Sequence, residues 1–140
     1  MGKMVKIDEA YRPSDEEPFM NERQREYYRR KLTNWKTEIL REAQDTLVAL
    51  QTESENHPDL ADRASSETDR AIELRARDRQ RKLIAKINAA IVRIDEGTYG
   101  YCEVTGEPIS LRRLEARPIA TLSIEAQERH ERMERVHRDD

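Results

Sequence analysis

Apolar residues recur with helical spacing through a long first stretch of the chain. Seven of them follow one another at steps of three or four residues: Tyr28, Leu32, Trp35, Ile39, Ala43, Leu47 and Leu50. This spacing predicts a single narrow stripe on a helix. Asn21 is a good N-cap residue, and neither Pro nor Gly interrupts residues 21–55. We therefore predict a helix over these residues, roughly 50 Å long at 1.5 Å per residue.

A second helical stretch follows a tight turn around Pro58 and runs from about Asp62 to Glu96. Its later part carries a clear apolar stripe: Leu83, Ile84, Ile87, Ile91 and Ile94. Its earlier part carries a thinner one: Ala64, Ala71, Ile72 and Leu74. Two long helices joined by a short turn lie antiparallel, and narrow stripes favour a coiled-coil pair. We expect a mainly α fold in which the base of the hairpin is stable and its tip is polar.

The rest of the chain has a different pattern. Residues 98–108 predict two short extended pieces around a turn. Ser110 can cap a short helix, and Ser123 can cap a last helix that ends near His137. The expected organisation is an N-terminal arm (1–20), a hairpin (21–97) with its tip at 56–64, a small module (98–122), and a C-terminal helix with a tail (123–140).

Composition narrows the class of protein. Charged residues make up 39% and hydrophobic residues 36%, too few for a large globular core. The 26 Lys and Arg residues nearly balance the 29 Asp and Glu residues, which excludes a strongly basic coat for nucleic acids. We expect no membrane span and no secretory signal. The single cysteine, Cys102, excludes an intrachain disulfide and favours a cytoplasmic location.

Cysteine and carboxylate side chains are the first candidates for chemistry. No histidine lies at a spacing typical of a catalytic thiol near Cys102, so we interpret it as structural, with a redox-sensing thiol as the alternative. Asp59 and Asp62 lie three residues apart at the end of a long arm. They could approach a cation there, or they could cap the second helix.

Basic residues are the third candidate. Arg79, Leu83 and Lys86 share one helix face. A solvated face is the simpler interpretation. Near the base of the hairpin, however, these residues could meet the basic side chains of the small module: Arg112, Arg113 and Arg117. Converging Arg and Lys side chains form sites for anions and phosphates.

Three motifs follow one another along the chain. They are D-x-x-D-R-A at 59–64, G-Y-C-E-x-x-G at 100–106 and R-R-L-E-A-R-P at 112–118. With the helical hairpin, they resemble the DksA/TraR family of bacterial transcription factors over about residues 15–135. The resemblance implies that the hairpin is followed by a zinc-finger-like module.

The resemblance also implies a partner and a mode of action. Family members bind RNA polymerase without recognising a DNA sequence of their own, and their coiled coil enters the secondary channel of the enzyme. Four residues match the functional tip that comes near the polymerase active site: Asn56, Asp59, Asp62 and Ala64. We expect a regulator of initiation rather than an enzyme. An intrachain hairpin predicts a monomer. We expect no binding to membranes.

Family members often act together with the alarmone ppGpp in the stringent response. Leu83, Lys86 and Arg117 match positions that border ppGpp at the polymerase interface, and Arg79 is a possible polymerase contact. Gln127 stands where the family often carries a basic residue, which affects the expected strength of the ppGpp response.

The chain departs from the family at the four cysteines that usually bind zinc. The matching residues are Cys102, Thr105, Ser123 and Ala126. One thiolate with these partners is not a zinc site, so the module is a degenerate zinc finger of the zinc-independent type, and no cofactor is required. We expect packing to replace the metal, through contacts with the hairpin base and these side chains: Tyr99, Tyr101, Ile109, Leu114, Leu122 and Ile124.

Three other functions stay open. A Gre-like transcript-cleavage factor would use the paired tip carboxylates to hold a second magnesium ion and promote RNA hydrolysis. A thiol redox sensor would depend on Cys102. A plain coiled-coil adaptor would tolerate substitutions at the tip.

Overall fold

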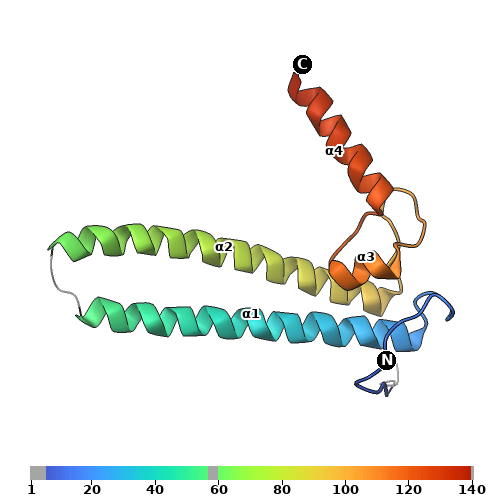
Figure 1. Cartoon of the computed structure of the whole chain (residues 1–140), viewed down its shortest axis with the longest axis horizontal. Helices are drawn as coiled ribbons and strands as arrows, with labels where there is room; N and C mark the ends of the chain where they lie inside the picture. The colour runs from blue at the N-terminus through green and yellow to red at the C-terminus, as the bar shows by residue number, and fades with distance from the viewer. Residues whose placement is uncertain (1–5, 57–59, 140) are drawn as a thin grey trace. The chain divides into compact units, whose positions relative to one another are not determined.

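The computed structural model describes residues 6–56 and 60–139, with side chains except at 53–56, 60–66 and 138–139. Over these residues the chain forms four helices: α1 (Glu22–Asn56), α2 (Leu60–Glu96), α3 (Leu111–Ala116) and α4 (Ile124–Asp139) (Figure 1). The only strand-like pairing in the described part is a single antiparallel bridge between Tyr101 and Pro108. The expectation of a mainly α fold is confirmed.

Helix α1 begins as the sequence predicts. The backbone N–H of Gln24 donates to Asn21 Oδ1 at 2.9 Å, so Asn21 is the N-cap. The predicted stripe faces inward along the whole helix. Tyr28, Leu32 and Ile39 are buried, and the other four members of the stripe are half-buried.

Helix α2 uses a different stripe from the predicted one in its earlier part. Ala71, Ile72 and Leu74 are exposed, so the prediction that they face α1 is wrong. The inward positions are seven residues at alternating steps of three and four: Glu73, Ala76, Gln80, Leu83, Ile87, Ala90 and Ile94. Ile72 and Leu74 each lie about 100° around the helix from Glu73, which turns them away from the seam.

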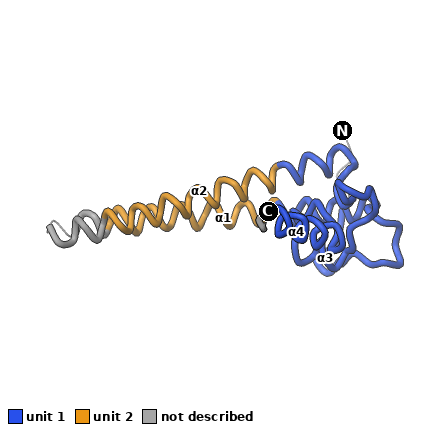
Figure 2. The backbone as a smooth tube through the Cα atoms, turned by 90° about the horizontal axis from the view of Figure 1, so that it is seen from above, with its two compact units in different colours: residues 1–32, 89–140 blue, residues 33–88 orange. Residues whose placement is uncertain are grey.

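The chain divides into two compact units (Figure 2). Unit 1 contains residues 1–32 and 89–140, so it includes the start of α1, the end of α2, and helices α3 and α4. Unit 2 contains residues 33–88, the remaining lengths of the two long helices. Within unit 2, Lys36 Nζ donates to Asn88 Oδ1 at 2.9 Å. This bond joins residues near the start of the unit to residues near its end, as an antiparallel pair requires.

Unit 1 holds most of the buried side chains. Tyr28 and Tyr99 pack with their ring centroids 5.5 Å apart, which joins α1 to the small module. The expectation that the module leans on the hairpin base is confirmed. Of the side chains expected to replace the metal, Tyr99, Ile109 and Leu114 are buried. Tyr101 is 38% exposed but packs on Phe19, whereas Ile124 is 48% exposed, so the prediction is wrong for Ile124.

The N-terminal arm packs into unit 1. Tyr11 and Met20 are buried, and Phe19 meets the Tyr101 ring edge-on at 5.4 Å. Gly100 has a φ of +89° and lies against Met20, where an added Cβ would come within 3.0 Å of Met20 Cγ. Gly100 therefore gives both the left-handed turn and the space that the arm occupies.

Two serines begin the last two helices. Ser110 Oγ accepts from Arg113 N at 3.2 Å, and Ser123 Oγ accepts from Ala126 N at the same distance. Both caps were predicted. Ala126 anchors α4 as its only buried residue with a described side chain. Among the described residues, no helix is long and apolar enough to cross a membrane.

Candidate functional site

The predicted tip lies largely outside the described part of the chain. Asn56 is the last residue of α1, and Asp62 and Ala64 lie in the first turns of α2, but their side chains are outside the described set. Asp59 lies outside the described residues altogether. Asp62 is inside α2 and does not precede it, so it is not the N-cap of that helix. The roles of these four tip residues stay predictions.

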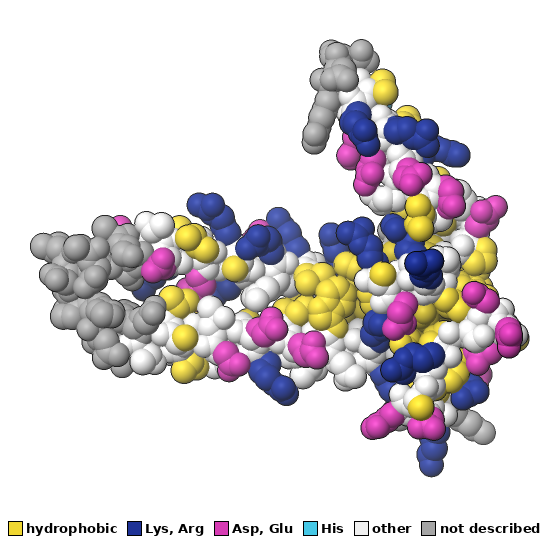
Figure 3. Space-filling model, viewed as in Figure 1, with side chains coloured by type: hydrophobic (Ala, Val, Ile, Leu, Met, Phe, Trp, Pro, Cys, Tyr) yellow, Lys and Arg dark blue, Asp and Glu magenta, His cyan; other side chains and the backbone are white. Residues whose placement is uncertain are grey.

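Charged side chains of α2 in unit 2 are partly paired with one another. Arg77 contacts Glu73 at 2.9 Å, while Asp78 contacts Arg81 at 2.9 Å and Lys82 at 3.1 Å. The hydrogen bond from Arg81 is the main reason that the pKa of Asp78 lies below its usual value. On the face shown in Figure 3, Lys and Arg side chains stand out along the outer side of α2.

Arg79 and Lys86 are exposed, and neither forms an ion pair in the part of the chain that the structure describes. Arg79 borders a shallow groove on the outside of the helix, together with Ile72 and Leu74. Leu83 is half-buried because it belongs to the seam with α1. Arg79 and Lys86 are therefore free to contact a partner, whereas Leu83 has a packing role as well.

Arg117 belongs to unit 1, whereas Leu83 and Lys86 belong to unit 2. Arg117 is the C-cap of α3, and its side chain is exposed. The convergence of these three residues on one anion stays a prediction. What the structure describes is the support of Arg117 within its own unit.

Glu115 on α3 is the centre of a polar cluster that the sequence analysis missed. Its carboxylate accepts from the Tyr27 hydroxyl at 2.8 and 2.9 Å and contacts Lys31 Nζ at 2.7 Å. Burial and the bond to Glu115 raise the pKa of Tyr27 to about 12. Burial alone would raise the pKa of Glu115, but the bonds from Lys31 and Tyr27 hold it below its usual value. The pair of Tyr27 and Lys31 at i and i+4, with an acid 84 residues after Lys31, gives no local signal in the sequence.

The same tyrosine connects this cluster to the arm. The Tyr11 ring meets Tyr27 edge-on at 6.1 Å, and the Arg12 guanidinium lies 5.9 Å from the Tyr27 ring centroid. The Tyr11 hydroxyl donates to Glu17 at 2.6 Å. Burial and this bond raise the pKa of Tyr11 to about 12. The arm is thus held by specific polar and aromatic contacts, although its sequence showed no periodicity.

Cys102 lies buried at 2% exposure in a tight turn, where Gly106 N donates to its carbonyl at 2.8 Å. Burial would raise the pKa of the Cys102 thiol. Donors from the Thr105 hydroxyl and from the N–H groups of Ser123, Thr105 and Val104 outweigh it and lower the pKa to about 6. The lowered pKa favours the thiolate form of Cys102.

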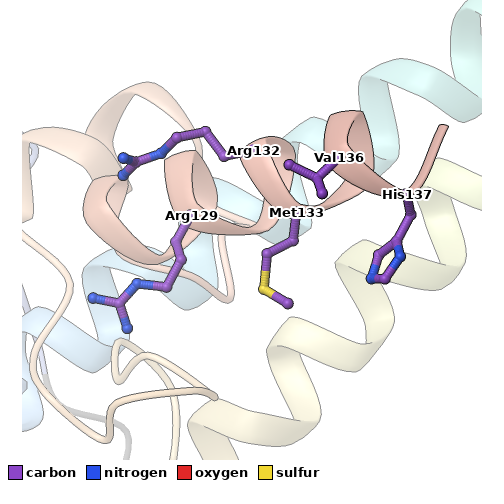
Figure 4. A pocket seen from close by; sticks show the side chains of 5 residues that line it. All are labelled: Arg129, Arg132, Met133, Val136 and His137. Atoms are coloured by element: carbon purple, nitrogen blue, oxygen red, sulfur yellow. The ribbon is translucent and has the colours of Figure 1, made fainter. Parts of the chain in front are cut away.

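Helix α4 presents a second exposed face beyond Ala126. Arg129, Met133 and His137 follow one another at i, i+4 and i+8, with Arg132 and Val136 beside them (Figure 4). Met133 and Val136 are 57% and 62% exposed. Gln127, where a basic residue is expected in the family, is half-buried and donates to Glu131 Oε1 at 3.1 Å.

Comparison with known proteins accounts for this arrangement. The family model for the "DnaK suppressor protein DksA, N-terminal domain" matches residues 24–94. The RNA polymerase-binding transcription factor DksA of Caulobacter vibrioides is 72% identical over 130 residues, which cover 93% of this chain and 92% of that protein. The chain belongs to the DksA family. A second model, the "Prokaryotic dksA/traR C4-type zinc finger", matches residues 97–132.

More distant DksA proteins support the same assignment. The RNA polymerase-binding transcription factor DksA of Escherichia coli is 43% identical over 117 residues, covering 84% of this chain and 78% of that protein. The solved structure of transcription factor DksA2 from Pseudomonas aeruginosa is 43% identical and superposes with a TM-score of 0.77. It covers 84% of this chain and 90% of that one.

The residues at the family's zinc positions do not fit a zinc ion. Cys102 is the only cysteine, and Ala126 offers no ligand atom. Ser123 Oγ is used to cap α4, and Thr105 Oγ accepts from Glu107 N at 3.2 Å. Structural zinc sites take four Cys or His ligands. No three His, Cys, Asp or Glu side chains of the described residues come together as a metal site either.

Proposed function

We propose that this protein binds RNA polymerase and regulates transcription initiation. The observation that carries this proposal is the 72% identity, across nearly the full length of both chains, with a protein named as an RNA polymerase-binding transcription factor. Its hairpin would enter the secondary channel and bring Asp59 and Asp62 close to the catalytic centre. A polar hairpin with few buried side chains suits such a role, because its surface must stay compatible with water until the channel encloses it.

We propose further that ppGpp strengthens this regulation as part of the stringent response. Lys86 and Arg117 would contact the phosphates, and Leu83 would border the nucleotide. Support comes from the exposure of Lys86 and Arg117 and from the absence of ion pairs to either within the described residues. Arg79 would contact the polymerase from the outer face of α2.

Regulation would not require zinc or another cofactor. The donor set at Cys102, Thr105, Ser123 and Ala126 supports this, since it does not fit the metal. Aromatic packing between Tyr28 and Tyr99 and the contacts of the arm would stabilise the module in its place. The protein would act as a cytoplasmic monomer, neither as an enzyme nor by recognising a DNA sequence.

In vitro transcription from a stable-RNA promoter tests these proposals together. Purified polymerase is titrated with the protein, with and without ppGpp, and a parallel set contains a zinc chelator. We expect inhibition that deepens with ppGpp and does not change with the chelator. Absence of any effect from a folded protein would contradict the polymerase role, and loss of inhibition in the chelator would contradict zinc independence.

One further assay and one outcome of the transcription assay separate other functions. Shortened RNA after incubation with a backtracked elongation complex would identify a transcript-cleavage factor. Inhibition without any response to ppGpp would retain the polymerase role and remove the proposed role of Lys86 and Arg117.

A redox response at Cys102 is a second candidate, favoured by the lowered pKa of its thiol. Its burial opposes rapid oxidation. Under the main proposal, Cys102→Ser leaves inhibition and its peroxide response unchanged. A peroxide response that is present in the parent protein and absent from the variant would establish the redox function.

A further inference from the structure

Arg117 is placed two residues after a surface cluster whose chemistry has no evident role in binding. The Glu115 carboxylate accepts a hydrogen bond from the Tyr27 hydroxyl at 2.8 Å and forms an ion pair with Lys31 Nζ at 2.7 Å. Both donors lie on α1, so these bonds fix the short helix α3 against the first long helix. The Glu115 side chain is 45% exposed. Ion pairs with this exposure contribute little to stability, so the orientation of α3 is the more informative consequence of the cluster.

The other side of Arg117 is also held. Its own N–H donates to Arg113 O at 2.7 Å, which closes the last turn of α3. The next residue, Pro118, restricts the backbone of residue 117. The Pro118 carbonyl accepts from the buried Tyr99 hydroxyl at 2.7 Å. The backbone that carries Arg117 is therefore fixed both before and after the residue.

The Arg117 side chain contrasts with this fixed backbone. It is exposed, and no ion pair or hydrogen bond of its guanidinium is found in the described part of the chain. A cation whose backbone is fixed before a ligand arrives loses less conformational freedom on binding. Orientation matters more for Arg than for Lys, because the guanidinium binds phosphate oxygens through a planar pair of donors.

We infer that Glu115 is a positioning residue, which acts with Tyr27 and Lys31 to hold Arg117 in the orientation that binds the phosphates of ppGpp. This inference rests on the proposed function, in which Arg117 contacts ppGpp. The ionisation states suit the role, since Glu115 is charged at neutral pH and Tyr27 keeps its proton.

The test compares four single variants of the full-length protein in the transcription assay. Glu115→Gln removes the charge, Tyr27→Phe removes one hydroxyl and keeps the ring, and Arg117→Ala removes the proposed ligand contact. Tyr101→Phe is the matched control, because it removes a tyrosine hydroxyl of the same unit that makes no hydrogen bond to a described residue. Each protein is titrated with ppGpp, and its inhibition and polymerase affinity are also measured without ppGpp.

We expect Glu115→Gln and Tyr27→Phe to raise the ppGpp concentration for half-maximal effect by about three- to tenfold, the size of effect that the loss of one typical hydrogen bond would have. Inhibition and affinity without ppGpp should stay at the level of the parent and of Tyr101→Phe. In an Arg117→Ala background, Glu115→Gln should add nothing further, because it acts through Arg117.

Three results would overturn the inference. An unchanged ppGpp response with Arg117→Ala would remove the proposed role of Arg117 and the inference with it. A response lost with Arg117→Ala but retained with Glu115→Gln and Tyr27→Phe would overturn the inference alone. Equal losses with and without ppGpp, or additive effects in the double variant, would assign Glu115 a merely structural role.

Discussion

The two units of this protein stabilise the same pair of helices in different ways. In unit 2, Ile39 and Ile87 are the only described side chains that are buried. Unit 1 buries three tyrosines, several aliphatic residues and Met20 of the N-terminal arm. On the face shown in Figure 3, hydrophobic side chains gather toward the end of α2 and are sparser toward its beginning. One continuous hairpin can therefore be well packed in unit 1, its base, and weakly packed in unit 2.

Polar residues in the seam between α1 and α2 explain why unit 2 is weakly packed. Glu73 and Gln80 occupy inward positions of α2, where a coiled coil normally has apolar residues. Ile72 and Leu74 are displaced to the outside of the helix and contribute little to the seam. The free energy of unfolding should therefore depend mainly on residues of unit 1.

The largest expected effect comes from matched isoleucine substitutions. Ile94→Ala, at a site with 1% exposure, should lower the free energy of unfolding by about 2–5 kcal/mol, because it leaves a cavity. Ile72→Ala, at a site with 55% exposure, should change it by less than about 0.5 kcal/mol. Urea unfolding followed by circular dichroism measures both. An equal loss of unfolding free energy at the two sites would contradict the distinction between unit 1 and unit 2.

Tyr28 and Tyr99, whose rings pack at an interplanar angle of 44°, give a second test within unit 1. The Tyr99 hydroxyl donates to the buried Pro118 carbonyl, so Tyr99→Phe should cost about 1–3 kcal/mol by leaving that oxygen unpaired. The buried Tyr28 hydroxyl has no partner among the described residues. Tyr28→Phe should therefore be neutral or stabilising in the same unfolding experiment. A larger loss for Tyr28→Phe than for Tyr99→Phe would contradict this assignment of hydrogen bonds.

A smaller effect is expected from replacing a polar residue in the seam of unit 2 with an apolar one. Gln80 is half-buried, so Gln80→Leu should stabilise unit 2 by about 1 kcal/mol through apolar burial. Gln44→Leu is the control, because Gln44 is exposed on α1 of the same unit. Amide hydrogen exchange in unit 2 should slow for Gln80→Leu but not for Gln44→Leu. Equal slowing in both variants would show that the position in the seam does not matter.

The smallest signal is the titration of one thiol in the base. The folded pKa of Cys102 is about 6, below its usual value of 9.0. The unfolded chain therefore binds more protons between these values, and the thiolate's contribution to stability is fully present above pH 9.0 and is lost as the pH falls through about 6. Thiolate absorbance should show an apparent pKa of about 6, and the stability difference from Cys102→Ser should grow as the pH rises. An ordinary thiol pKa would contradict the donor arrangement.

Much of the fold follows from local sequence signals. Asn21, Ser110 and Ser123 act as caps where they were predicted, and Gly97, a residue type common after a helix, has a positive φ of 81° after α2. These features depend on neighbouring residues alone. The seam of early α2 could not be identified in this way, since Ile72 and Leu74 are apolar but fall outside the register that the later isoleucines set.

The candidate site was less accessible from the sequence. The motif R-R-L-E-A-R-P identified Arg117, but nothing local connects its Glu115 to Tyr27 and Lys31, more than 80 residues earlier. The sequence indicated an N-terminal arm but not its contacts, because these are individual aromatic and polar pairs without periodicity. Such contacts depend on tertiary packing, which a single sequence does not reveal.

We propose that the tip acts on the polymerase, whereas contacts elsewhere in the protein, Arg79 among them, hold it on the enzyme. The most direct test measures polymerase affinity and promoter inhibition for Asp62→Asn, with Asp69→Asn, an exposed carboxylate farther along α2, as control. The account predicts that Asp62→Asn keeps its affinity and loses inhibition, while Asp69→Asn retains both. Unchanged inhibition by Asp62→Asn at equal affinity would contradict the claim.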